Sequence, residues 1–159
     1  MDIFNSIPKK GITFNHRGAP LDPDLRPLWR ISLILIILKK LCSGQKANSK
    51  KVQALYSLVS SEKKRNAYPV SNNALASTKP INIHFDPLVD RAVDMGIGYD
   101  LFKLDDSKRV CLTDKGENFS KKIEADSHIF TVEKDYMSQF KKSHFTDKVI
   151  NTLIAGDLL

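Results

Sequence analysis

The chain has 159 residues, 42% hydrophobic and 27% charged, a composition typical of one folded domain or two very small ones. A chain of this length can bury a core without disulfide or metal cross-links, so a disulfide scaffold, collagen and wholesale disorder are disfavoured. Its net charge of +7, from 25 Lys and Arg against 18 Asp and Glu, suits an acidic partner: nucleic acid, an anionic membrane or an acidic protein surface.

The N-terminal sequence, the apolar runs and the cysteines predict a cytoplasmic protein without a membrane segment. Met1–Ser6 has neither the basic nor the apolar region of a signal peptide. The longest apolar run, Ile31–Leu38, contains eight residues, whereas a membrane-spanning helix needs about 20. Cys42 falls in an apolar helix and Cys111 in a strand, which favours buried, reduced thiols over the alternative of a disulfide between them.

Residues 1–28 are predicted to form an extended N-terminal arm. Pro20, Pro23 and Pro27 lie within eight positions, and this spacing blocks helix propagation. The apolar side chains that could attach the arm to the body of the protein or to a partner are Ile3, Phe4, Ile7, Ile12, Phe14 and Leu21.

Residues 28–42 are predicted to form a helix, because the segment has helical length, follows Pro27 and ends in lysines. Its apolar run has no clean period, so a buried strand is the alternative. As a helix it is apolar nearly all round, which indicates that one face packs on the core and another binds a partner through Trp29, Ile31 and Ile34. Complete burial by the protein's own chain is the other interpretation, and the favoured one.

Residues 48–65 form a clearer amphipathic helix, which Asn48 or Ser49 can cap. One face of this helix gathers apolar side chains at helical spacing: Val52, Leu55, Tyr56 and Val59. Residues 66–83 follow as a long polar loop, and loops of this length are uncommon unless they are mobile or functional.

A short helix is predicted over residues 86–96. Asp86 can act as its N-cap, Pro87 is a favoured first residue, and Gly96 ends it. The apolar residues with helical spacing are Leu88, Ala92 and Met95.

Residues 97–104 and 108–112 are predicted to pair as a β-hairpin, with the turn at Asp105–Ser107. Thr113 then caps a helix that runs to about Asp126. The inward side chains of this helix are expected to be Phe119 and Ile123.

Two more helices complete the chain. The first covers residues 131–142, and the second begins after Thr146 as its cap. Their expected apolar faces are Val132, Tyr136 and Phe140 in the first, and Val149, Ile150, Leu153 and Ile154 in the second.

Between residues 29 and 126 the order is three helices, a two-stranded wing and a fourth helix, which is the order of a winged helix-turn-helix domain. The step Leu112–Gly116, Leu-Thr-Asp-Lys-Gly, is typical of a wing strand turning into the next helix, with Gly116 allowing close packing on the sheet. The predicted fold is therefore mainly α with a small β-hairpin. It comprises the arm (1–28), a winged-helix domain (29–126) and a C-terminal helical extension (127–159).

The positive charge is concentrated in residues 29–70, which hold nine basic residues and one acidic residue, a net +8, while the rest of the chain sums to −1. Each lysine alone could be a solvated helix end, but together they are typical of a patch that follows phosphates or meets an acidic partner. This predicted basic patch consists of Lys39, Lys40, Lys46, Lys50, Lys51, Lys63, Lys64 and Arg65.

The outward face of the helix at 86–96 is expected to carry Asp86, Asp90 and Asp94, with Arg91 as its only basic residue. A helix that reads DNA needs Arg, Lys, Asn or Gln there, and a row of carboxylates would repel phosphate. The open interpretations are a solvated acidic face, a contact with a basic partner through these aspartates, and DNA readout, which is the least favoured.

No catalytic or cofactor motif is found, so the sequence predicts no enzyme, no metal and no cofactor. The histidines stand far apart and lack metal-ligand spacing to each other or to the cysteines: His16, His84, His128 and His144. Gly96-x-Gly98 leads into a strand rather than a helix, so it fails the test for a dinucleotide site. The Asp105–Asp106 pair occupies a hairpin turn, where aspartate is expected for structural reasons.

Six stretches within residues 24–155 carry a resemblance to a known family: Asp24–Arg30, Lys50–Leu55, Phe85–Val93, Leu112–Gly116, Glu133–Met137 and Phe145–Ile150. In this order they resemble the small middle component of bacterial ABC-three-component defence systems, of which the Lamassu anti-phage systems are a branch. The stretches before residue 24 and at 66–83 match nothing in that family.

The resemblance implies a non-catalytic subunit between an SMC-like ABC ATPase that senses DNA and an effector, commonly a nuclease. The first helix and the arm would then bind a partner subunit, and the basic patch would meet double-stranded DNA or an acidic coiled coil. No membrane and no small-molecule substrate are implied. The alternatives are a dimeric, stand-alone winged-helix transcriptional regulator and an adaptor of the toxin–antitoxin or phage kind.

Overall fold

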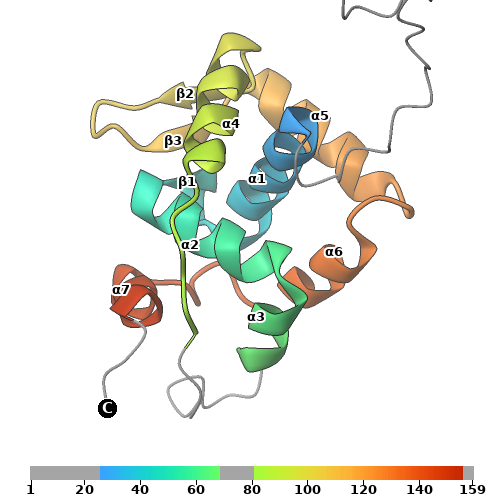
Figure 1. The fold of residues 1–159 in the computed structure, drawn as a ribbon. Helices are drawn as coiled ribbons and strands as arrows, with labels where there is room; N and C mark the ends of the chain where they lie inside the picture. Colours follow the sequence, from blue (N-terminus) through green and yellow to red (C-terminus); the bar gives the residue numbers. More distant parts are fainter. Residues whose placement is uncertain (1–25, 69–80, 156–159) are drawn as a thin grey trace, which may run out of the picture.

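A computed structural model describes residues 26–68 and 81–155 of the chain. The predicted arm, apart from its last three residues, and most of the predicted loop at 66–83 therefore lie outside the described residues. The described part is mainly helical with one small antiparallel sheet, as predicted (Figure 1). Its elements are α1 (Pro27–Leu41), the 3₁₀ turn η3 (Ser43–Gln45), β1 (Lys46–Ala47), α2 (Ser49–Ser60), α3 (Glu62–Ala67), α4 (Pro87–Gly98), β2 (Phe102–Leu104), β3 (Val110–Leu112), α5 (Asp114–Ala125), α6 (Thr131–Ser138) and α7 (Asp147–Ala155).

Helix α1 is the centre of the fold. It packs against α2, α4, α5, α6 and β3 (Figure 1), so its apolar run is covered on every side. The prediction of a helix is confirmed, and the strand alternative is wrong. Ile31 and Ile34, expected as partner contacts, have no exposed surface and belong to the core instead, because other helices of the same chain occupy the face assigned to a partner. Trp29 is half-buried, with its ring centroid 4.2 Å from that of Phe130.

The single helix predicted over 48–65 is two helices. Asn48 caps α2 as predicted, its side-chain oxygen accepting from the Lys51 backbone N–H at 2.8 Å. Ser61 then adopts an extended backbone and caps α3 by accepting from the N–H of Lys64. A serine whose side chain can replace a backbone partner favours such a break. The face predicted to be buried is confirmed: Val52, Leu55, Tyr56 and Val59 are at most 5% exposed.

The predicted hairpin pairs β2 with β3, and a third strand, β1, lies on the other side of β3, giving the order β1-β3-β2. β1 has two residues, with Lys46 opposite Cys111 and Ala47 opposite Val110. A two-residue strand has no period of its own, so this sheet is one strand larger than the sequence predicts.

Two glycines allow close approaches between helices and the sheet. A Cβ atom at Gly116 would overlap the backbone carbonyl of Leu101, and one at Gly96 would overlap the ring of Phe102. Thr113 caps α5 by accepting from the Gly116 N–H at 2.9 Å, as predicted, and donates its own proton to the carbonyl of Asp100 at 2.7 Å. The Leu-Thr-x-x-Gly step therefore acts as expected.

The C-terminal helices share the core of the preceding segment. Met137 and Phe145 are each 1% exposed and belong to the same cluster as Ile31. The hydroxyl of Tyr68, at the end of α3, lies 2.8 Å from Nε2 of His144. The expected last cap is confirmed, since Thr146 accepts from the N–H of Val149.

Two expected inward side chains were assigned wrongly. Phe119 is 38% exposed, because its neighbour Ser120 faces the core instead, and Val132 is 59% exposed, although Tyr136 and Phe140 of the same expected face are buried. The helix predicted over 131–142 also ends earlier, at Ser138.

Gly116→Ala is expected to lower the free energy of unfolding by about 1–3 kcal/mol, the usual cost of overpacking, because a backbone carbonyl cannot move aside for the new methyl group. Gly98→Ala is the matched control, since nothing lies within 4 Å of its added Cβ. That helical change should be neutral or stabilise the protein by about 0.5–1 kcal/mol. Urea unfolding of both variants measures the difference, and equal effects would contradict the close approach.

Candidate interaction surface

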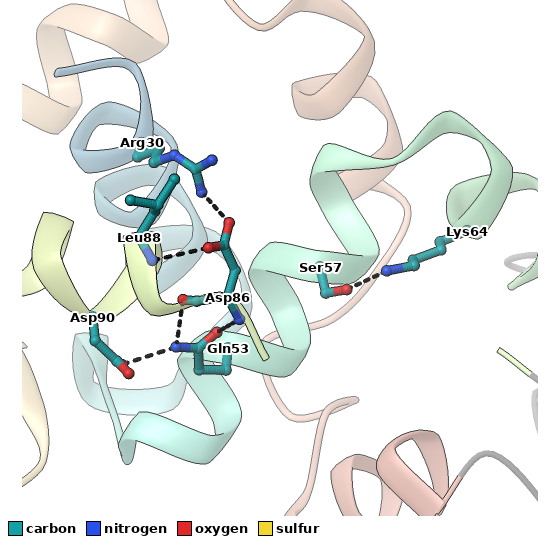
Figure 2. Close-up of polar contacts among 7 residues, drawn as sticks. All are labelled: Arg30, Gln53, Ser57, Lys64, Asp86, Leu88 and Asp90. Carbon is teal, nitrogen blue, oxygen red and sulfur yellow. Dashed lines mark hydrogen bonds and ion pairs between the residues drawn. The ribbon is translucent and has the colours of Figure 1, made fainter. Parts of the chain in front are cut away.

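The aspartates predicted as one acidic face of α4 have different environments. Asp86 forms an ion pair with Arg30 of α1 at 2.6 Å, and the Arg30 side chain is only 9% exposed (Figure 2). Asp86 is also the N-cap of α4, accepting from the N–H of Leu88 at 2.9 Å, as predicted. This carboxylate is therefore committed to the protein's own fold.

The side-chain amide of Gln53 holds α4 against α2 (Figure 2). Its Nε2 donates to the Asp86 carbonyl at 3.1 Å and to Oδ1 of Asp90 at 2.9 Å, and its Oε1 accepts from the Asp86 N–H at 3.0 Å. Gln53 is 3% exposed, so leaving its buried amide without these bonds would be costly. Ser49 adds a longer bond, 3.4 Å, to the same oxygen of Asp90.

Asp90 and Asp94 are both exposed, as predicted for the outward face of α4. Of the three aspartates, Asp94 alone has no hydrogen-bond or ion-pair partner within residues 26–68 and 81–155. The three aspartates therefore divide into Asp86 and Asp90, which position α4, and Asp94, which is free to meet another molecule.

The other exposed edge of α4 is apolar. Leu88, Met95 and Tyr99 follow helical spacing and are 38%, 40% and 52% exposed, and Phe85, just before the N-cap, is 53% exposed. We name Leu88, Met95 and Tyr99 the apolar edge of α4. Of the three apolar residues with helical spacing in the sequence, Ala92 is buried, whereas Leu88 and Met95 are exposed.

The face of α4 that does enter the core consists of Val89, Ala92 and Gly96, which are all buried. It is turned by about one residue from the set Leu88, Ala92 and Met95 that the sequence shows at helical spacing. Both sets have helical spacing, so periodicity alone could not choose between them.

Seven of the eight basic residues predicted as one patch lie on three helices, each beside a different C-terminal segment, and the eighth, Lys46, lies on β1. On α1, Lys39 and Lys40 both pair with Glu124 of α5, at 2.8 and 2.9 Å. On α2, Lys50 donates to the side chain of Asn151 at 2.8 Å and Lys51 to the carbonyl of Phe145 at 2.5 Å.

On α3, Arg65 lies 3.7 Å from the carboxylate of Glu133 on α6, and Lys64 donates to the hydroxyl of Ser57 (Figure 2). Lys46 and Lys63 have no ion-pair or hydrogen-bond partner in the described part of the chain. Most of the ammonium and guanidinium groups that a phosphate backbone would use are thus engaged within the protein.

Local environment also sets the protonation of several groups. Hydrogen bonding from Lys39 is the main cause that lowers the pKa of Glu124, against an opposing effect of burial, with Lys40 adding to the decrease. Burial lowers the pKa of Lys64 and of His144. Burial raises the pKa of the Cys42 thiol to about 11, with a smaller opposing effect of Lys51, so this thiol stays protonated and unreactive. Both cysteines are free and buried.

The described residues contain no group of three or more His, Cys, Asp or Glu side chains that could hold a metal ion. Within the same residues, none of the helices combines the length and the apolarity needed to cross a bilayer. No protein-family model matches the chain, and neither curated proteins nor solved structures give a significant match.

The division of the aspartates can be tested by stability. Asp86→Asn keeps a capping oxygen but removes the charge facing Arg30, so we expect it to lower the free energy of unfolding by about 1–3 kcal/mol. Asp94→Asn, the matched control on the same helix, should change it by less than about 0.5 kcal/mol. Urea titrations near neutral pH measure both, and comparable losses would show that Asp94 has a structural role as well.

The lowered pKa of Glu124 predicts a pH dependence. A carboxyl group with a folded-state pKa below its unfolded value contributes stability above the unfolded pKa, and this contribution is lost as pH falls through the folded pKa. Glu124→Gln should therefore cost about 1 kcal/mol near neutral pH, the scale of partly exposed ion pairs. The difference in stability between wild type and variant should disappear in acid, below the ordinary glutamate pKa of 4.5. Urea unfolding across this pH range measures the difference, and a constant difference would contradict the assignment.

Proposed function

We propose that this chain is a non-catalytic, protein-binding subunit built on a winged-helix core, with α4 as its main contact helix. The observation that carries the proposal is the apolar edge of α4, where Leu88, Met95 and Tyr99 are each at least 38% exposed. Large apolar side chains exposed together are typical of protein-interaction sites.

The winged-helix assignment is supported by the order of elements. Helix α1, strand β1, helix α2, helix α4, strands β2 and β3, and helix α5 come in this order, with the short helix α3 inserted between α2 and α4, and the sheet has the order β1-β3-β2. The β2–β3 hairpin then corresponds to the wing, and α4 to the helix that enters the DNA groove in nucleic-acid-binding members. Residues 29–126 would form this domain, with α6 and α7 packed onto it as an extension.

Protein contact fits α4 better than DNA readout does. Its solvent-facing residues include a single basic side chain, Arg91, together with the unpaired carboxylate of Asp94. Base readout in the major groove relies on Arg, Lys, Asn and Gln, and a free carboxylate repels phosphate. The basic side chains of α1, α2 and α3 add little to a DNA interface, because most of them have hydrogen-bond or ion-pair partners within the protein.

The six sequence stretches that resemble a known family indicate the kind of complex to which the subunit would belong. On their resemblance to the middle component of ABC-three-component systems, we propose that the protein links an SMC-like ABC ATPase to an effector nuclease in a cytoplasmic anti-phage defence complex. The rigid packing of α4 on α1 and α2 supports such a role, since a linking subunit needs a contact helix held in one orientation.

The test is co-expression of the full chain with the proteins encoded beside its gene, followed by affinity purification of one of them. The double variant Leu88→Asp/Met95→Asp should reduce the recovered partner at least about tenfold, because charges would replace the apolar contact. Val132→Asp, on the exposed side of α6, is the matched control and should leave recovery unchanged. Urea unfolding verifies that each variant is folded.

Two results would overturn the proposal. Separation of the wild-type chain from all neighbouring proteins at moderate salt excludes the linking role. Tight duplex binding by the isolated chain, with a steep salt dependence that charge reversal of Lys50, Lys51, Lys63 and Lys64 abolishes, would instead establish the transcriptional regulator.

A further inference from the structure

A groove of about 250 Å³ lies between α2, α4 and the β2–β3 hairpin, and it is separate from the apolar edge of α4. Val93 and Ile97 of α4 form one wall, and Leu104 of β2, which is 53% exposed, forms part of the opposite wall. Val52 and Val110 complete an aliphatic lining.

The size and chemistry of the groove suit a side chain better than a metabolite. Small-molecule sites usually enclose roughly 300–1,000 Å³ and combine apolar walls with several converging polar groups. This groove is smaller, and its polar residues are Ser49, Asp90, Asp94 and Lys108. Interface anchors, by contrast, are single large side chains inserted into well-packed pockets.

The charges beside the groove favour a cation. Oδ1 of Asp90 is held by Gln53 at 2.9 Å, which fixes this carboxylate in place, and Asp94 one turn later has no partner among the described residues. Lys108 is the only cationic side chain in the lining, and it comes from the hairpin.

We propose that this groove binds a cationic amphipathic segment of a partner protein. A leucine- or phenylalanine-sized side chain enters between Val93, Ile97 and Leu104. A lysine or arginine next to it pairs with Asp94, supported by Asp90. Lys108 on the hairpin disfavours a second cation there, which gives the bound segment a direction. The inference rests on the proposed protein-binding function and adds a second contact to the apolar edge of α4.

The probe is a phage-displayed library of random 12-residue peptides selected on the immobilised full chain. Enriched sequences should place a basic residue beside a large apolar one, and fluorescence anisotropy with the synthetic peptides should give saturable binding. Asp94→Lys and Leu104→Asp should each weaken that binding at least about tenfold, since a loss of about 1.4 kcal/mol corresponds to a factor of ten. The matched controls Asp135→Lys and Val132→Asp, both at exposed positions on α6, should leave it unchanged.

The proposal is overturned if no peptide is enriched, if enriched peptides lack basic residues, or if Asp94→Lys leaves binding intact. It is also overturned if the wild-type chain dimerises in light scattering and Asp94→Lys abolishes the dimer, because the occupant is then a second copy. The two proposals fail in different ways. If Leu88→Asp/Met95→Asp loses the partner while Asp94→Lys and Leu104→Asp retain it, the groove proposal alone is rejected. If the groove binds peptides but no partner protein is recovered with the wild-type chain, the proposed function is rejected.

Discussion

The arrangement of this protein depends on how α4 is fixed to α1 and α2. The ion pair between Arg30 and Asp86 and the three hydrogen bonds of Gln53 join these helices at the N-terminal end of α4. Both Arg30 and Gln53 are buried, so each would pay a desolvation cost if α4 turned about its axis and broke these contacts. The same contacts decide which residues of α4 reach solvent. They leave Leu88 and Met95 on one edge and Asp94 near the groove, and both proposed binding surfaces follow from that orientation.

Local signals in the sequence predicted much of this fold. Asn48, Asp86, Thr113 and Thr146 cap helices as expected, because a cap needs only a side-chain oxygen and a backbone N–H two or three residues away. The face of α4 depended on contacts distant in sequence instead. The approach of Gly96 to Phe102, the pairing of Asp86 with Arg30 and the hydrogen bonds of Gln53 select the buried set over the neighbouring one. The break at Ser61 and the short strand β1 were missed for a related reason, since neither interrupts the apolar pattern.

The distribution of charge shows a similar limit of sequence-based prediction. Counting residues correctly located the positive surplus in 29–70, but the count could not show where each side chain points. Glu124 and Glu133 lie outside that segment in sequence and beside it in space, so they pair with Lys39, Lys40 and Arg65. Asp86, Asp90 and Asp94 also differ in environment because of contacts distant in sequence, since Arg30, the partner of Asp86, is 56 residues away along the chain. Segment charge is thus a statement about composition, and a binding surface also requires that the charges have no partners of their own.

The central position of α1 has a consequence for synthesis of the protein. Its apolar surface is covered in part by Phe130, Met137 and other residues that the ribosome adds roughly one hundred residues later. At translation rates of about 5–20 residues per second, this delay is on the order of 5–20 s. During that interval α1, which has almost no polar face, has left the ribosome without the residues that bury it in the folded protein. Until α6 has been synthesised, α1 of a newly made chain needs protection by a chaperone or a low concentration of other nascent chains. Strong overproduction therefore favours aggregation.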